Sequence, residues 1–125
     1  MRKDPHPAVT TWIASHNETL AIPAVAIAEL SFGIERIRPA ERSQKLEVAF
    51  DEICKRFSAR IIAFDAQSAL VYGKLVGTLQ RRGRLISMPD GMIAATALRH
   101  RTALATRNTK HFTGLGIELF NPWEA

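Results

Sequence analysis

Two carboxylates, Glu29 and Asp90, stand in sequence surroundings that suit the binding of a metal ion. Glu29 falls inside a predicted helix, and Gly33 lies four residues later on the same face, which leaves room above the carboxylate. Asp90 follows Pro89 at the predicted start of another helix, where free N–H groups and the helix dipole stabilise its charged form. Hard cations bind ionised carboxylates of this kind. Each residue also has a structural explanation, since Glu29 can pair with Arg36 in solvent and Asp90 can simply stabilise a helix start.

A polar segment at residues 105–112 follows a predicted strand and adds a third candidate group. Asn108 could orient a metal-bound water or a substrate, while Arg107, Lys110 and His111 could meet phosphate oxygens. Asn108 is equally a common turn or helix-cap residue. His111 has no second histidine at ligand spacing, so we do not expect a zinc site here.

Basic residues outnumber acidic ones, with 17 Lys and Arg against 12 Asp and Glu, which gives a net charge of +5. A basic surface favours an anionic partner, because cations that contact phosphates release counterions. Arg81, Arg82 and Arg84 form a cluster on a predicted loop. This cluster is either a guide for a nucleic acid or the solvated end of a helix.

Length and composition predict one globular domain that spans residues 1–125. The hydrophobic runs are short, so we expect no membrane-spanning helix, and the charged start does not resemble a signal peptide. We therefore expect a cytoplasmic protein. Cys54 is the single cysteine and is interpreted as a small core residue, so an internal disulfide is excluded.

Hydrophobic periodicity predicts an alternation of helices and short apolar strands. The predicted helices span 7–16, 23–38, 46–57, 66–82 and 88–101, and the predicted strands span 20–22, 61–64, 103–106 and 117–120. The second helix carries one apolar stripe, Ile27, Leu30, Ile34 and Ile37, and Asp65 is the predicted N-cap of the fourth. Strands separated by helices favour a parallel sheet covered on both faces. Such sheets commonly carry their ligand residues at the carboxyl ends of central strands.

Three segments, in this order, resemble the motifs of the PIN domain family. They are AELSFG at 28–33, PDGMIAATA at 89–97 and TRNT at 106–109. The ending FNPW at 120–123 is similar to the FitB branch of the VapC-like toxins. The resemblance covers nearly the whole chain.

The resemblance implies a PIN-like three-layer α/β/α sandwich with a short parallel sheet, and an endoribonuclease that hydrolyses RNA phosphodiester bonds. Glu29 and Asp90 would hold Mg²⁺ or Mn²⁺, and Asn108 would take the fourth position of the acidic pocket. Magnesium prefers carboxylate and water oxygens and can activate water for attack on a phosphate. The RNA-binding candidates are Arg107, Lys110, Arg81, Arg82 and Arg84.

The same resemblance implies partners. We expect a cognate antitoxin of the VapB or FitA type, a homodimer, and contact with promoter DNA only through the antitoxin complex. Trp12, Phe32, Ile34 and Ile37 are candidates for dimer or antitoxin contacts, or for the core. The alternative function is a noncatalytic module that binds an antitoxin and takes part in promoter regulation. A generic nucleotide-binding domain is disfavoured, because neither a Gly-x-Gly-x-x-Gly nor a P-loop pattern occurs.

The sequence departs from the family at its start, where the strand ending in an Asp-Thr-Asn type motif has no counterpart. Asp4 is no substitute, because Arg2, Lys3 and Pro5 surround it and no apolar strand precedes it. Three explanations compete for this missing motif: a start codon placed too far downstream, a shortened chain, or a degenerate copy. We favour the first. With fewer carboxylates and open strand edges, the chain as written is expected to be a poor nuclease that needs a partner or self-association for stability.

Overall fold

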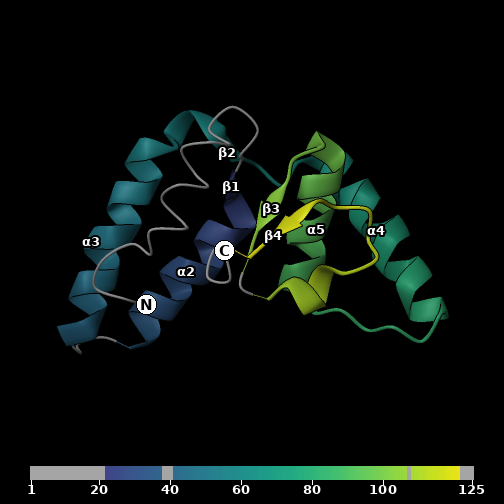
Figure 1. The fold of residues 1–125 in the computed structure, drawn as a ribbon, viewed down its shortest axis with the longest axis horizontal. Helices are drawn as coiled ribbons and strands as arrows, with labels where there is room; N and C mark the ends of the chain where they lie inside the picture. The colour runs from purple at the N-terminus through teal and green to yellow at the C-terminus, as the bar shows by residue number, and fades with distance from the viewer. Residues whose placement is uncertain (1–21, 38–40, 107, 122–125) are drawn as a thin grey trace.

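The computed structural model describes residues 22–37, 41–106 and 108–121 (Figure 1). The elements are, in order, β1 (Ile22–Pro23), α2 (Ala24–Arg36), α3 (Glu41–Arg56), the 3₁₀ turn η1 (Ser58–Arg60), β2 (Ile61–Ile62), α4 (Ala66–Arg81), α5 (Met88–His100), β3 (Leu104–Ala105), the 3₁₀ turn η2 (Thr109–Phe112) and β4 (Leu119–Phe120). The predicted helix at 7–16 and the candidate contact residue Trp12 lie outside the described residues.

The strands are parallel, as the alternation of apolar runs and helices predicts. β1 pairs with β2, with Ile22 opposite Ile61, and β3 pairs with β4, with Leu104 opposite Leu119. In the part of the chain that the structure describes, these two pairs share no ladder hydrogen bonds and form two separate pieces of sheet. Each strand is shorter than its apolar run, so Phe64 follows β2 as irregular chain.

The core joins the two pieces of sheet and the helices around them. One cluster consists of the buried residues Ile93, Ala94, Leu104, Phe112 and Leu115, and a second cluster is built on Phe57 and Ala103. Residues of β1, β3 and β4 pack against the second cluster, so the strand pairs meet there. Figure 1 shows α2 and α3 on one side of the strands and α4 and α5 on the other, which is the layered α/β arrangement that the sequence predicts.

The apolar stripe of α2 is only partly buried. Ile34 belongs to the core, but Leu30 is 52% exposed and Phe32 is 68% exposed. Helical spacing places these side chains on the helix, whereas the neighbouring elements decide which of them is covered. Of the candidate contact residues, Ile34 is therefore a core residue and Phe32 is open to a partner.

Asp65 caps α4 as predicted. Its Oδ1 accepts a hydrogen bond of 2.8 Å from the backbone N–H of Ser68. The hydrogen bond from the Ser68 backbone lowers the pKa of Asp65 from its ordinary value of 3.8. A cap of this kind satisfies one of the free N–H groups at the helix start.

This cap predicts an acid-dependent loss of stability. A pKa lowered by folding contributes stability above the unfolded value of 3.8, and that contribution is lost as the pH falls through the folded pKa. We expect Asp65→Ala to lower the melting temperature at pH 7 and to weaken its decline in acid. Asp65→Asn, which keeps an acceptor, should recover part of the stability at pH 7. Thermal unfolding between pH 2.5 and 7 measures this, and an unchanged acid profile in Asp65→Ala would contradict the assignment.

Candidate active site

Asp90 lies in the first turn of α5, which its own sequence organises. Ser87 is the N-cap, and its Oγ accepts a hydrogen bond of 3.3 Å from the backbone N–H of Asp90. Pro89 lies at the start of the helix, where its missing N–H costs nothing. The Asp90 side chain is 20% exposed, so it is reachable from solvent while the helix dipole favours its charge.

Glu29 lies on α2, which packs against α5, with Val25 and Ala26 in contact with the cluster that contains Ile93 and Ala94. Its carboxylate is at the surface, but neighbouring protein atoms exclude part of the water around it. This desolvation raises the pKa of Glu29 from its ordinary value of 4.5, and the negative charge of Asp90 raises it further. The structure therefore brings the two predicted carboxylates within electrostatic reach of each other.

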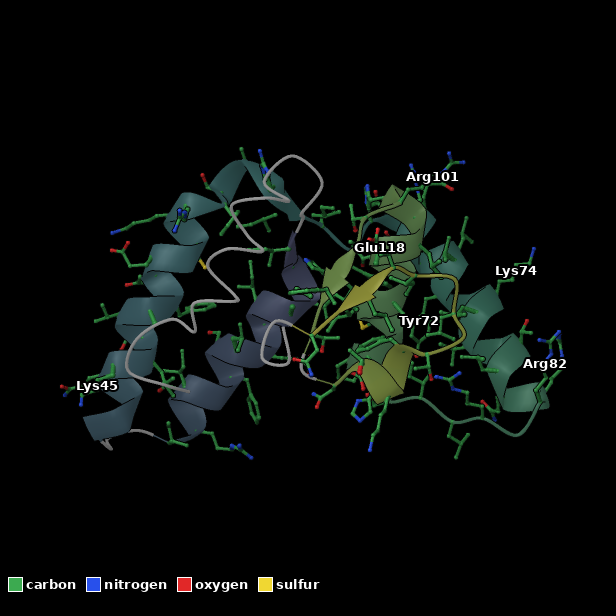
Figure 2. All side chains as sticks on the ribbon, viewed as in Figure 1. Lys45, Tyr72, Lys74, Arg82, Arg101 and Glu118 are labelled. Carbon is green, nitrogen blue, oxygen red and sulfur yellow. The ribbon has the colours of Figure 1, made fainter. Side chains whose placement is uncertain are left out.

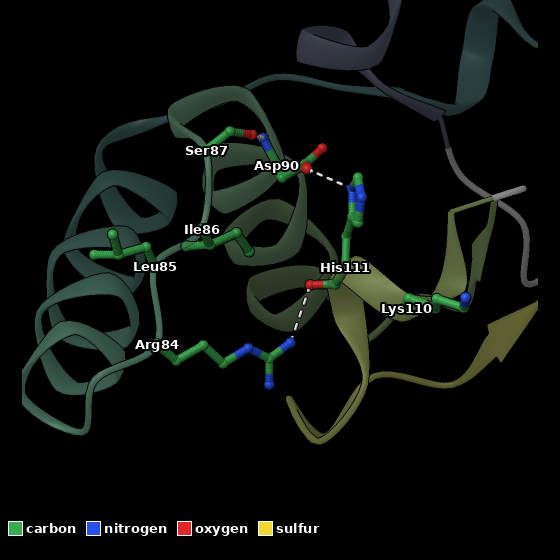
Figure 3. A pocket seen from close by; sticks show the side chains of 7 residues that line it. All are labelled: Arg84, Leu85, Ile86, Ser87, Asp90, Lys110 and His111. Atoms are coloured by element: carbon green, nitrogen blue, oxygen red, sulfur yellow. Dashed lines mark hydrogen bonds and ion pairs between the residues drawn. The ribbon is translucent and has the colours of Figure 1, made fainter.

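His111 is the side chain in direct contact with Asp90. Its Nδ1 lies 2.9 Å from Oδ2 of Asp90, and the ring is 53% exposed at the surface (Figure 3). The histidine comes from η2, which follows β3, and the aspartate from the start of α5. Sequence reasoning gave His111 a phosphate contact and missed its contact with Asp90, because no local spacing signals a pairing across 21 residues.

Asn108, the third predicted site residue, shapes the turn through its backbone. Its N–H donates to Oγ1 of Thr106 at 3.0 Å, and its carbonyl accepts from the N–H of His111 at 3.0 Å. The residue is exposed, and it is the N-cap of η2 without a side-chain cap bond. Arg107, which precedes it, lies outside the described residues.

The carboxylates fit a hard divalent cation that keeps several of its waters. Magnesium is commonly bound by one or two carboxylates together with water and substrate phosphates. Within residues 22–37, 41–106 and 108–121, no three His, Cys, Asp or Glu side chains are close enough to form a complete ligand set. The repulsion that raises the pKa of Glu29 is what a cation between Glu29 and Asp90 would relieve.

This repulsion predicts that the metal-free protein gains stability when Glu29 is neutralised. Since folding raises the pKa of Glu29 above 4.5, the free energy of unfolding falls as the pH rises from 4.5 through the folded pKa. In EDTA at pH 7, Glu29→Gln should raise the melting temperature by up to a few degrees, because solvent screens a partly exposed carboxylate. Adding Mg²⁺ should stabilise the parent more than this variant.

Glu52 provides the control, because it is an exposed glutamate on α3. Glu52→Gln should leave both the melting temperature in EDTA and the response to Mg²⁺ unchanged. A Glu29→Gln protein that is less stable than the parent in EDTA would contradict the repulsion.

The predicted basic residues fall into two groups. Arg84, Lys110 and His111 line a pocket of about 300 Å³ together with Leu85, Ile86, Ser87 and Asp90 (Figure 3). Arg81 and Arg82 are exposed at the end of α4, and Figure 2 places Arg82 at the edge of the molecule. The structure therefore places Arg84 and Lys110 in the same pocket as Asp90. Arg81 and Arg82 lie outside this pocket, at the end of α4.

The protein is an α/β protein with parallel strands between helix layers, and it brings a carboxylate at the start of α5 near a second carboxylate on α2. Comparison with known proteins identifies the family. The PIN domain profile matches residues 1–115. The chain belongs to the PIN domain family, which confirms the resemblance seen in the sequence.

Related chains are similar over almost their whole length. The VapC ribonuclease Y4jK of Sinorhizobium fredii is 34% identical over 98% of this chain and 89% of its own length. Toxin FitB of Neisseria gonorrhoeae is 31% identical over 98% of this chain and 90% of its own length. Ribonuclease VapC2 of Rickettsia felis is 28% identical over 90% of this chain and 80% of its own length.

Solved structures of the same family superimpose well. A chain of FitAcB from Neisseria gonorrhoeae matches with a TM-score of 0.81 and 31% identity over 99% of this chain and 91% of its own. A chain of VapBC2 from Rickettsia felis bound to a promoter DNA fragment matches with a TM-score of 0.76 and 28% identity over 94% of this chain and 86% of its own. The PIN-domain fold is thereby confirmed. None of the described helices is both long and apolar enough to cross a membrane.

Proposed function

We propose that this chain is the endoribonuclease toxin of a toxin-antitoxin pair and that it hydrolyses RNA phosphodiester bonds with a divalent cation. The observation that carries this proposal is that Glu29 on α2 and Asp90 on α5 lie within electrostatic reach of each other in a chain of the PIN domain family. Relatives with about 30% identity over most of this chain are named as VapC ribonucleases or as toxin FitB. Divalent-metal dependence is general in PIN-domain ribonucleases, and Mg²⁺ or Mn²⁺ suits this carboxylate pair.

The residues of the chain have separate roles in this reaction. A bound cation would supply an activated water and stabilise charge on the attacked phosphate. Asp90 on α5 and Glu29 on α2 would hold this cation. His111 keeps the Asp90 carboxylate in one orientation through its 2.9 Å contact, as outer partners of metal-binding carboxylates do. Asn108 is exposed and would orient the metal-bound water or the substrate without adding a charge.

A cognate antitoxin of the VapB or FitA type is the proposed partner, and it would cover the acidic pocket. The solved relatives that match this chain are toxin-antitoxin complexes, among them FitAB bound to a DNA fragment. The exposed side chains of Leu30 and Phe32 on α2 give a homodimer or an antitoxin an apolar surface to bind. Promoter DNA would then be contacted through the antitoxin complex.

The alternative is a noncatalytic module that binds the antitoxin and takes part in promoter regulation. The observation that favours it is that solved relatives are toxin-antitoxin complexes bound to DNA. Cleavage of a mixed structured RNA pool with Mg²⁺ or Mn²⁺, compared with EDTA, separates the two functions. Metal-dependent cleavage supports the ribonuclease, whereas antitoxin binding without any cleavage, with either metal, supports the module.

A further inference from the structure

The pocket beside Asp90 is lined by basic side chains whose role the carboxylate pair does not explain. Two basic side chains, Arg84 and Lys110, line the pocket against one acidic side chain, Asp90. A cation bound at Asp90 would make this balance more positive. The pocket therefore suits an anion that lies next to the metal.

Arg84 is held in a fixed orientation. Its Nη1 donates to the carbonyl of Thr113 at 2.6 Å, and its Nη2 donates to the carbonyl of His111 at 3.1 Å. Figure 3 shows the side chain reaching from the segment before α5 toward the η2 turn. A guanidinium has five N–H donors, so these two bonds leave others for an anion. An oriented donor loses less entropy on binding than a mobile surface arginine.

Polar groups on the other walls of the pocket complement this arginine. The hydroxyl of Ser87 accepts from the Asp90 N–H and can still donate its own hydrogen. The His111 ring uses Nδ1 for its contact with Asp90, so we do not count it among the donors of the pocket. Lys110 is exposed and also lines the pocket, from the η2 side. Arg84 and Ser87 from the segment before α5 and Lys110 from η2 thus line one pocket.

We propose that this pocket is a phosphate subsite, which binds a phosphodiester group of the RNA strand adjacent to the one that is cleaved. Arg84 and Lys110 are its charged contacts, and the Ser87 hydroxyl is a neutral donor. The inference rests on the proposed function for the identity of the polyanion. It assigns this contact to the pocket and not to the exposed Arg81 and Arg82 at the end of α4.

The test measures RNA binding in EDTA, where cleavage does not interfere. A fluorescent single-stranded RNA is titrated against the parent, Lys110→Gln, Arg82→Gln and Lys74→Gln over a series of salt concentrations. Lys74 is an exposed lysine on α4 outside the pocket and serves as the matched control. Loss of one phosphate contact lowers the slope of log affinity against log salt by about 0.7 for a single strand.

We expect Lys110→Gln to weaken binding several-fold and to lower this slope, while Arg82→Gln and Lys74→Gln match the parent. Arg84→Gln should weaken binding at least as much, and thermal unfolding shows whether it folds; if it does not, Lys110→Gln carries the test. A parent that binds no RNA, or a Lys110→Gln protein with unchanged affinity and slope, overturns the subsite. Cleavage is measured separately with Mg²⁺ and with Mn²⁺, so Lys110-dependent binding without cleavage by either metal overturns the proposed function and leaves the subsite standing.

Discussion

Asp90→Asn is expected to reduce metal-dependent RNA cleavage by at least about 100-fold, because a bound metal contributes several kcal/mol of transition-state stabilisation. Asn has the same shape as Asp but no charge, so it can hold neither a divalent cation nor its activated water in the same way. The backbone bond from residue 90 to Ser87 does not depend on the side chain. The fold should therefore persist while the chemistry is lost.

The measurement compares initial cleavage rates of the RNA pool by the parent, Asp90→Asn and Asp51→Asn, each with Mn²⁺ and with EDTA. Asp51 lies exposed on α3, on the opposite side of the strands from α5, so its variant controls for a general change of charge. Circular dichroism confirms that each variant is folded. Cleavage by Asp90→Asn at the parent rate would show that the nuclease activity resides elsewhere or in a contaminant.

The features that the sequence predicts correctly depend on neighbouring residues along the chain. Asp65 is three residues from the N–H that it caps, and Asp90 stands in the first turn of α5. Helical spacing likewise locates α2, α4 and α5 to within two residues, whereas α3 begins at Glu41, five residues before the predicted start. The family motifs add the pairing of Glu29 with Asp90, which no local pattern contains.

The features that the sequence misses depend on contacts between distant segments. Arg84 looks like part of a basic cluster with Arg81 and Arg82, yet it bonds to carbonyls 27 and 29 residues away. His111 has no metal-ligand spacing and still contacts Asp90. Leu30 belongs to an apolar stripe and is exposed, because no described element covers it. Side-chain type predicts what a residue can do, whereas the path of the loops decides which group it meets.

Gly91→Ala is expected to destabilise the protein by about 1–3 kcal/mol, the usual cost of overpacking a close contact. α4 and α5 pack tightly at this glycine, which is buried next to the site residue Asp90. A Cβ atom at position 91 would lie 2.8 Å from Cε2 of Tyr72 and 2.9 Å from Cγ2 of Val76. A ring atom and a branched methyl group have little freedom to retreat, so the helices must separate or α5 must shift.

Gly77→Ala on α4 is the matched control, because a Cβ atom there meets no atom within 4 Å. The same exchange at this exposed helix position should stabilise the protein by about 0.5–1 kcal/mol through helix propensity. Urea unfolding followed by circular dichroism measures both variants. If the two substitutions change the free energy of unfolding in opposite directions, helix packing explains the glycine at position 91. Folded Gly91→Ala should also cleave RNA more slowly, because Asp90 moves with α5. Equal stabilisation by both substitutions would mean that Tyr72 and Val76 yield freely, and the close helix contact would then not explain the glycine beside the site.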